Sequence, residues 1–558
     1  MDVDDVFESI GGVSKYQIAV ILASAFSLLA ATMSSQLAVF LSATPTYRCA
    51  LPTLHINASM LTHSELVNLF IPPEDSCQRY DYNLTQCEEE NNLSCITNQT
   101  EVRIIPCDYG YHYDKTYYDQ TTISEWDFIC GRETFDSIAN SCIFLGFFMG
   151  SAACGILMDK FGRNTARLIC CIVFIVSGCI ASFVPLFGVY LVFRVIMAGS
   201  GLAVYLCVFT YVTEISPKEY RTFFVTVCAV ISGVSHTILP LLAYPFRSWR
   251  SLCLVNSLLA TPFLGIYFLI PESPRWLICN GREDDAREVL KRIAKSKNVE
   301  LNEEVFHKIQ SNKDSEECES KKKYFYTDIF RMANMRMITI IIMLDWFVVS
   351  MVFYGLTLNV GRLAGDPYIN ATANAFIEVL GYSTYFIVAR KIGSKTTTAL
   401  AYFLGAICCI STMLLTEFSC GNQDMIEAGR WIAISGKFFA SWAFQGIYQL
   451  TVTLHPTVTR GKGMALGSMA ARVGSMIMPF TLQIQNSIPW LTQTIFGTLA
   501  FIACSATMLL PETRSLSLLT TVDEAENFYR KHFVLNFKKN GKMDNELVVE
   551  IEMEKQQA

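Results

Sequence analysis

Twelve apolar windows recur along the 558 residues of this chain, and each is long enough to cross a membrane as a helix. A helix that spans the hydrocarbon core needs about 20 mainly apolar residues. Only 17% of the residues are charged, against roughly 25% in soluble proteins. We therefore expect an all-α membrane protein with twelve transmembrane helices, at residues 17–41, 138–158, 166–186, 189–212, 222–243, 251–270, 337–360, 371–389, 396–416, 430–453, 463–482 and 491–511.

The formal net charge of −6 argues against a protein that binds nucleic acid. The sequence also lacks a phosphate-binding Gly-x-x-x-x-Gly-Lys-Ser/Thr loop, a His-Glu-x-x-His pair and a Gly-x-Ser-x-Gly turn. We therefore expect neither an enzyme nor an ATP-driven pump, and no bound cofactor or metal.

Lysine and arginine near the ends of membrane helices indicate the cytoplasmic side. The short loop 159–167 contains three of these residues, whereas the loop 417–429 contains three acidic residues and no Lys or Arg. Both termini are then cytoplasmic, and the plasma membrane is the expected location. The predicted order is a cytoplasmic N-terminus (1–16), a first helix (17–41), an extracellular loop (42–134), helices two to six (138–270), a cytoplasmic helical loop (271–336), helices seven to twelve (337–511) and a cytoplasmic tail (512–558).

The extracellular loop carries two kinds of sequence signal that suit an oxidising, glycosylating compartment. Four Asn-x-Ser/Thr sites can be glycosylated only on the non-cytoplasmic side. Six cysteines allow up to three disulfides, with 15 possible pairings. The predicted glycosylation sites are Asn57, Asn83, Asn92 and Asn98, and the predicted disulfide cysteines are Cys49, Cys77, Cys87, Cys95, Cys107 and Cys130.

The chain also contains an internal repeat. Pro271-Glu272-Ser273 follows the sixth window, and Pro511-Glu512-Thr513 follows the twelfth. Likewise, Pro217 and Arg221 follow the fourth window, and Pro456 and Arg460 follow the tenth. Such repeats predict two six-helix halves with a substrate site between them, near the middle of the membrane.

The segment GILMDKFGR, from Gly155 to Arg163, resembles the loop between the second and third helices of the major facilitator superfamily. The segments PESPRWLICNGR from Pro271 and WFVVSMVFYGLTLN from Trp346 resemble its organic cation, anion and carnitine transporter family more narrowly. The resemblance implies transport by alternating access and a charge network that closes the cytoplasmic side. Its expected gating residues here are Asp159, Gly162, Arg163, Glu214, Arg221 and Arg460.

Charged residues inside the predicted helices cost about 3 kcal/mol or more each, so each one needs a reason. Glu378 can pair with Lys437 or Arg472, or these groups can bind a substrate ion, and the two readings are compatible. Aromatic side chains nearby can hold an organic cation by cation–π attraction, although helix packing is their commoner use. The candidate substrate-binding residues are Arg472, Lys437, Glu378, Tyr448, Gln445, Trp346, Tyr205 and His236.

The combination of Glu378, Lys437 and Arg472 most resembles the carnitine-type branch of the family. We therefore expect a secondary-active transporter of small organic cations or zwitterions such as carnitine, whose partners are the substrate ion and membrane lipid. An organic anion transporter is one alternative. A receptor-like membrane protein that has lost transport is another. Sodium or a proton is a possible coupling ion.

Overall fold

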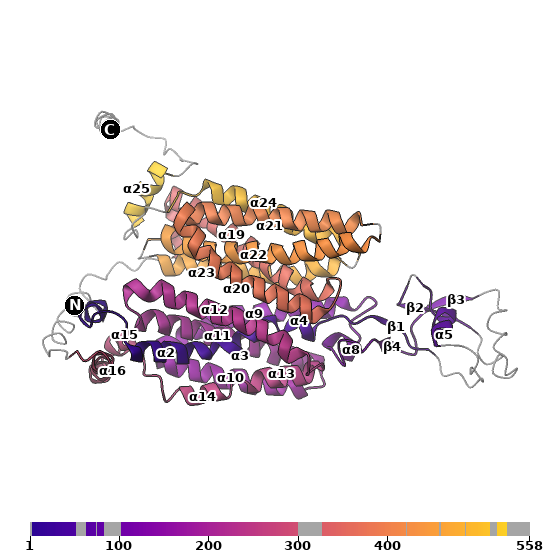
Figure 1. The fold of residues 1–558 in the computed structure, drawn as a ribbon, viewed down its shortest axis with the longest axis horizontal. Coiled ribbons are helices and arrows are strands. Elements are labelled where there is room, and N and C mark those ends of the chain that lie inside the picture. Colours follow the sequence, from indigo (N-terminus) through magenta and orange to yellow (C-terminus); the bar gives the residue numbers. More distant parts are fainter. Residues whose placement is uncertain are drawn as a thin grey trace.

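The computed structural model of the protein describes residues 3–51, 63–73, 75–82, 102–299, 326–419, 421–456, 459–485, 487–513 and 522–532. Within these residues, two helical bundles lie side by side, one from each half of the sequence (Figure 1). The first described helix, α1 Val3–Ser9, and the last, α25 Val522–His532, lie at one end of the bundles, and the strands lie beyond the other end (Figure 1). We call these ends the termini end and the loop end.

The first half of the chain forms one of the two helical bundles. Its first window, 17–41, is divided among three consecutive helices, and the first of these begins with a capping box in which Ser14 and Gln17 satisfy each other's backbone amides. The helices of this half are α1 Val3–Ser9, α2 Lys15–Phe26, α3 Leu28–Gln36, α4 Ala38–Leu41, α9 Glu133–Phe161, α10 Arg163–Phe183, α11 Phe187–Ile215, η1 Lys218–Tyr220, α12 Arg221–Ala243, α13 Trp249–Leu258 and α14 Pro262–Ile266.

The second half repeats this arrangement with longer unbroken helices. Helix α20 starts at an Asp366 cap whose carboxylate accepts bonds from the amides of Tyr368 and Ile369. The elements of this half and its flanks are α15 Pro274–Cys279, α16 Glu283–Lys295, α18 Tyr326–Arg331, α19 Ala333–Asn359, η2 Val360–Arg362, α20 Pro367–Ile392, α21 Ser394–Glu417, α22 Gln423–Leu454, α23 Arg460–Ile484, α24 Pro489–Leu509 and α25 Val522–His532.

Nine helical segments within the described residues are long and apolar enough to cross a membrane. The predicted windows 371–389, 430–453 and 463–482 form helices α20, α22 and α23, which are not among these nine. These are the three helices that carry the charged residues Glu378, Lys437 and Arg472. These charged side chains lower the mean hydropathy of the helices that carry them. The number of membrane spans, twelve, therefore stays a prediction.

Two window boundaries differ from the sequence prediction for physical reasons. The sixth window, 251–270, is interrupted after α13 and resumes at Pro262, whose ring cannot donate a helical hydrogen bond. Helix α22 begins at Gln423 rather than at residue 430, because Asn422 caps the backbone amide of Asp424. Lys437 consequently lies near the middle of its helix.

Helices α9 and α11 approach each other unusually closely. A Cβ atom on Gly150 would lie 2.2 Å from the carbonyl oxygen of Gly199, and one on Gly146 would lie 2.4 Å from that of Val195. Small residues four apart permit such contact between membrane helices, where tight packing rather than hydrophobicity drives association.

The loop end carries the described part of the predicted extracellular loop. Strand β1 Tyr47–Cys49 pairs with β4 Tyr111–Tyr113, and β2 Gln78–Asp81 pairs with β3 Arg103–Pro106. Two disulfides join Cys49 to Cys107 and Cys77 to Cys130. Helices α5 His63–Phe70 and α8 Thr122–Trp126 complete this region. The predicted sites Asn57, Asn83, Asn92, Asn98, Cys87 and Cys95 lie outside the described residues.

The loop is anchored on the first half. Both Arg250 and the indole nitrogen of Trp249, on α13, bind the carboxylate of Glu125 on α8. The indole of Trp126 donates to the carbonyl oxygen of Pro185, between α10 and α11. These contacts make α8 part of the first bundle.

Candidate substrate site between the two halves

The two halves meet along two helix pairs, α9 with α23 and α12 with α20. At the loop end of the first pair, the Ser141 hydroxyl donates to the carbonyl oxygen of Met476 at 2.8 Å. Ser137 donates to Gln483 at 3.1 Å. These contacts hold α9 against α23 near the loop.

Tyr368 joins the second helix pair at the same end. Its hydroxyl donates to the carbonyl oxygen of Tyr117 at 2.6 Å, and its ring lies 5.5 Å from that of Tyr244, the residue after α12, and 5.6 Å from that of Phe40. The side chain is buried. Tyr368 therefore links the second half to both the loop and the first half.

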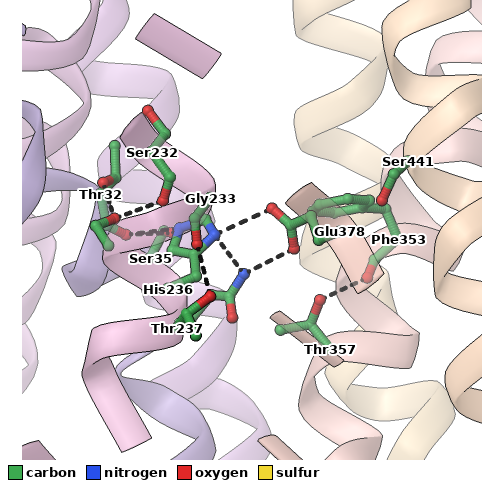
Figure 2. Close-up of polar contacts among 12 residues, drawn as sticks. Thr32, Ser35, Ser232, Gly233, His236, Thr237, Phe353, Thr357, Glu378 and Ser441 are labelled. Carbon is green, nitrogen blue, oxygen red and sulfur yellow. Dashed lines mark hydrogen bonds and ion pairs between the residues drawn. The ribbon is translucent and has the colours of Figure 1, made fainter. Parts of the chain in front are cut away.

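Glu378 lies near the middle of α20, and its side chain points toward the first half (Figure 2). Its side chain has no exposed surface. One carboxylate oxygen lies 3.0 Å from Nδ1 of His236 on α12, and the other accepts a 3.1 Å bond from the Gln36 amide on α3. The carboxylate therefore connects the two bundles at mid-depth.

Lys437, on α22, supplies the opposite charge. Its Nζ lies 3.4 Å from the second oxygen of Glu378, so the sequence hypothesis of an internal pair is realised with Lys437 and not with Arg472. The ammonium also donates to the Thr357 hydroxyl at 2.5 Å and to the Phe353 carbonyl oxygen at 3.2 Å. It lies 3.0 Å from the centre of the Phe353 ring. The buried ammonium therefore has a carboxylate, a hydroxyl and a carbonyl oxygen as acceptors. A buried charge needs such partners.

Arg472 lies midway along α23 and is only partly buried. Its guanidinium lies 5.2 Å from the centre of the Phe147 ring on α9, in the first half. It is within electrostatic range of the Tyr354 and Tyr448 hydroxyls, and its Nε has no hydrogen-bond partner. The ion pairs of the described residues do not include Arg472. Among the residues that the structure describes, Arg472 is thus a cation without an acidic partner.

Aromatic side chains surround these charges. The ring of Trp346 lies 4.4 Å from that of Tyr448, and the ring of Tyr354 lies 4.9 Å from that of Phe144 across the two halves. Tyr205 is within electrostatic range of Tyr354 and Tyr448. The indole nitrogen of Trp346 donates to Thr451, so that ring is fixed in position. Aromatic faces therefore border the centre from both halves.

Most of the predicted substrate residues converge on this centre, in two groups. His236, Glu378 and Lys437 form the polar bridge between the halves, whereas Tyr205, Trp346, Tyr448 and Arg472 lie on its aromatic side. Gln445 is half-buried on α22, between Lys437 and Tyr448 in sequence. The sequence analysis missed Gln36 and Thr357 as site residues. A glutamine in an apolar window was the available signal for Gln36.

A small cavity lies beside the polar bridge, between the halves. It is lined by Gln36, Phe40 and His236 from the first half and by Thr357 and Asn374 from the second. The rest of its lining is apolar, from Val39, Leu239, Pro240, Val360 and Ala371.

Asp345 lies outside the centre. It is fully buried, its Oδ2 accepts a 2.9 Å bond from Thr507 on α24, and its Oδ1 has no partner. This agrees with the helical spacing, which places Asp345 on a face with apolar neighbours.

The predicted gating residues lie at the termini end. Arg163 pairs with Glu214 at 2.9 Å and with Asp159 at 3.9 Å, although Asp159 is largely exposed. Arg221 donates to the carbonyl oxygens of Thr213 and Ser216. Arg460 has two guanidinium nitrogens, Nε and Nη2, without a partner. The expected pairing of Arg163 with Glu214 is therefore present in the structure.

Glu272 makes a contact that the sequence analysis did not assign. Its carboxylate accepts bonds from the backbone amides of Arg163 and Asn164 at 2.8 and 3.1 Å, and so caps the N-terminus of α10. A carboxylate at this position also interacts favourably with the helix dipole. In the second half, Glu512 lies beside Gly393 and binds Thr396 at the start of α21. The repeated Pro-Glu segment thus places a carboxylate beside the glycine that precedes a helix in each half, and we call each of these contacts a carboxylate clasp.

Gly162 makes the clasp possible, and replacing it with alanine should destabilise the protein. Its φ is 92°, and a Cβ atom would lie 2.4 Å from the Glu272 carboxylate. We expect a loss of about 1–3 kcal/mol, measured as a lower melting temperature of the purified protein. Gly155→Ala is the matched control, because a Cβ there meets nothing within 4 Å and alanine favours a helix. Equal effects of the two substitutions would contradict the role of Gly162.

The fold is similar to that of solved sugar transporters. The xylose transporter XylE from E. coli, in a partially occluded inward open conformation, matches with a TM-score of 0.60 and 14% identity, over 90% of this chain and all of that one. A second structure of the same proton:xylose symporter matches with a TM-score of 0.58. The two packed bundles therefore have the fold of this major facilitator superfamily transporter.

Residues 104–523 match the model of the sugar (and other) transporter family, so the chain belongs to that family. The organic cation transporter protein of Drosophila melanogaster is 28% identical over 95% of this chain and 96% of its own length. The organic cation/carnitine transporter 2 of Homo sapiens is 27% identical over 94% of each chain. Solute carrier family 22 member 7 of Rattus norvegicus is 28% identical over 94% of this chain and 98% of its own length. The expected superfamily is confirmed, and the chain is a multi-pass membrane transporter and not an enzyme.

Proposed function

We propose that the protein is a secondary-active transporter that moves a small organic ion with an anionic group by alternating access, and that a zwitterion such as carnitine is the first candidate. The proposal rests on a difference between Glu378 and Arg472 in the partners that surround them. Within the described residues, Glu378 contacts His236, Gln36 and Lys437, whereas Arg472 forms no ion pair with an acidic side chain.

The charge balance favours an anionic group on the substrate. Lys437 and Glu378 offset each other within the second half, and Arg472 then contributes the uncompensated positive charge. A guanidinium binds a carboxylate through paired, charge-assisted hydrogen bonds. In a partly buried site with aromatic walls, such a pair is stronger than in water.

The aromatic side chains can bind the cationic end of a zwitterion. A quaternary ammonium group cannot donate hydrogen bonds, and proteins recognise it through aromatic faces. Tyr354 and Tyr448 are close enough to interact with Arg472, and we propose that these rings bind the cationic end while Arg472 binds the carboxylate. Relatives of the chain include an organic cation/carnitine transporter, which is consistent with this assignment.

Uptake into cells that express the protein tests the substrate class. We expect uptake of labelled carnitine, weaker uptake of an aromatic carboxylate, and none of a tetraalkylammonium cation. Uptake of the carboxylate alone would favour the second candidate, an organic anion transporter. Uptake of the cation alone would contradict the role of Arg472. No uptake of any of the three would favour the receptor-like alternative.

We infer that the contacts at the loop end form the outer gate. Ser137, Ser141 and Tyr368 join the halves there, and a transporter of this type must separate these contacts to admit substrate from outside. The Arg163–Glu214 pair and the two carboxylate clasps belong to the opposite gate. With the loop outside the cell, both termini are cytoplasmic, and we propose the plasma membrane as the location.

Glycan removal tests this orientation. Four Asn-x-Ser/Thr sites lie in the loop 42–134, so we expect enzymatic deglycosylation to shift the gel mobility of the protein by several glycans. A variant that lacks Asn57, Asn83, Asn92 and Asn98 should show no shift. A wild-type protein that fails to shift would contradict the orientation.

A further inference from the structure

Trp346 lies on α19 and packs against two other helices of the second half. Its exposed fraction is only 2%, so the ring itself offers almost no surface to a substrate. The indole nitrogen donates to the Thr451 hydroxyl on α22 at 2.9 Å, and that hydroxyl donates in turn to the carbonyl oxygen of Ile447 at 2.6 Å. These hydrogen bonds hold the nitrogen-bearing edge of the ring against α22.

Gly467 on α23 leaves the space that the same edge of the ring occupies. A Cβ atom on Gly467 would lie 2.4 Å from Cδ1 and 2.5 Å from Nε1 of Trp346, well inside the separation of about 3.5–4.0 Å at which carbon atoms attract each other. Two turns further along α23, a Cβ atom on Gly474 would lie 2.4 Å from the backbone carbonyl oxygen of Phe347. Because α19 and α23 are in such close contact, any side chain at position 467 must displace the indole or separate the two helices.

Tyr448 on α22 is the neighbour through which Trp346 affects the candidate substrate site. The centres of the two rings lie 4.4 Å apart, and their planes are at 77°, an edge-to-face contact at the short end of the aromatic range. Tyr448 is half-buried and close enough to interact with Arg472. The position of the Tyr448 ring therefore depends on an indole whose own position depends on Gly467.

We propose that Gly467 and Trp346 are positioning residues that act through Tyr448 and so limit the size of the cationic group that the transporter accepts. The Gly467 backbone accommodates the indole, and the indole supports the Tyr448 ring. The Tyr448 ring contacts the cationic end of the substrate, while Arg472 binds the carboxylate. This inference rests on the proposed function and adds a size limit that the charges alone do not set.

Two zwitterions of different size measure this limit: carnitine, whose cation is a trimethylammonium group, and its triethylammonium analogue. The measured quantity is Vmax/KM for the analogue divided by Vmax/KM for carnitine. Gly467→Ala should lower this ratio by about tenfold, the effect of a methylene-sized change in a tight pocket. Trp346→Leu, whose shorter side chain leaves space behind Tyr448, should raise it. The ratio does not depend on the amount of protein at the cell surface, so a loss of folded protein alone leaves it unchanged.

Two further variants test the route through Tyr448. In a Tyr448→Ala background, Gly467→Ala should leave the ratio unchanged, because the ring that transmits the displacement is absent. Gly405→Ala is the matched control: Gly405 is buried in α21, and a Cβ atom there would meet only the Cβ of Phe439 within 4 Å, at an ordinary 3.7 Å. If Gly467→Ala keeps the wild-type ratio, or changes it equally without the Tyr448 ring, the proposal is wrong.

A stability measurement that needs no substrate tests the contact between Gly467 and Trp346. Gly467→Ala should lower the melting temperature of the purified full-length protein by several degrees, because the added methyl group overpacks a filled interface. The same substitution in a Trp346→Leu background should cost much less, because the methyl group then enters space that the indole has left. Equal losses in the two backgrounds would show that the indole does not sense position 467 and would overturn the proposal.

The two kinds of measurement separate this inference from the proposed function. Uptake of carnitine with a ratio that neither Gly467→Ala nor Trp346→Leu changes would support transport and overturn the size limit. Uptake of neither zwitterion, in a protein whose melting temperatures show the coupling between Gly467 and Trp346, would contradict the proposed function, and the size limit would fall with it.

Discussion

Replacing Lys437 with methionine should cause a large loss of stability, about 3–5 kcal/mol, the range for breaking a buried ion pair. The substitution leaves Glu378, which has no exposed surface, without the ammonium 3.4 Å away. It also leaves the Thr357 hydroxyl and the Phe353 carbonyl oxygen without their donor. We expect the apparent melting temperature, measured by fluorescence-detected size-exclusion chromatography after heating, to fall by several degrees.

The double variant Glu378→Gln with Lys437→Met separates the pair from the packing. Removing both charges should recover much of the lost stability, because a neutral amide can keep hydrogen bonds and no ion is left unpaired. Lys160→Met, at the termini end of α9, is the control for loss of a lysine at the helix surface. If Lys437→Met is as stable as the wild type, the pair is not structural and both charges are available to substrate.

Replacing Arg472 with alanine should reduce uptake of an anionic or zwitterionic substrate by about 10–100-fold, the loss expected for one charge-assisted contact. Stability should change little, because the described contacts of Arg472 are with aromatic rings and tyrosine hydroxyls, not with an acid. Uptake divided by the amount of protein at the cell surface is the measurement.

Two further variants sharpen the Arg472 test. Arg472→Lys keeps the charge but loses the bidentate geometry, so uptake should fall between the wild type and the alanine variant. Arg336→Ala removes an exposed arginine near the start of α19 and should leave uptake unchanged. Normal uptake by Arg472→Ala at normal surface levels would exclude Arg472 as the substrate anchor.

The architecture follows closely from patterns in the sequence. Long apolar windows and the repeated Pro-Glu-Ser/Thr segment predict two helical halves, and the structure places Glu272 and Glu512 in matching clasps. Helix ends were less predictable. Caps such as Asn422 extend a helix beyond its apolar window, and Pro262 interrupts one, because hydrogen bonding and not hydropathy sets those ends.

The site was only partly predictable, for a different reason. Charge in an apolar window marks Glu378, Lys437 and Arg472, since burial of charge is costly. The sequence cannot decide which two of them pair, because that depends on how the helices rotate against each other. Gln36 carries no charge, and its role appears only when α3 is placed beside α12 and α20.

If the loop lies outside the cell, as proposed, its anchoring has a practical consequence for reagents that recognise the cell surface. Glu125 binds Arg250 and Trp249 of the first half, whereas Tyr117 contacts Tyr368 of the second. An antibody that recognises the β1–β4 ribbon alone would be carried along as the first bundle moves, and transport would continue. An antibody whose footprint covers both Tyr117 and the neighbouring end of α20 would tie the bundles together, hold the outer entrance shut and act as an inhibitor without entering the substrate path.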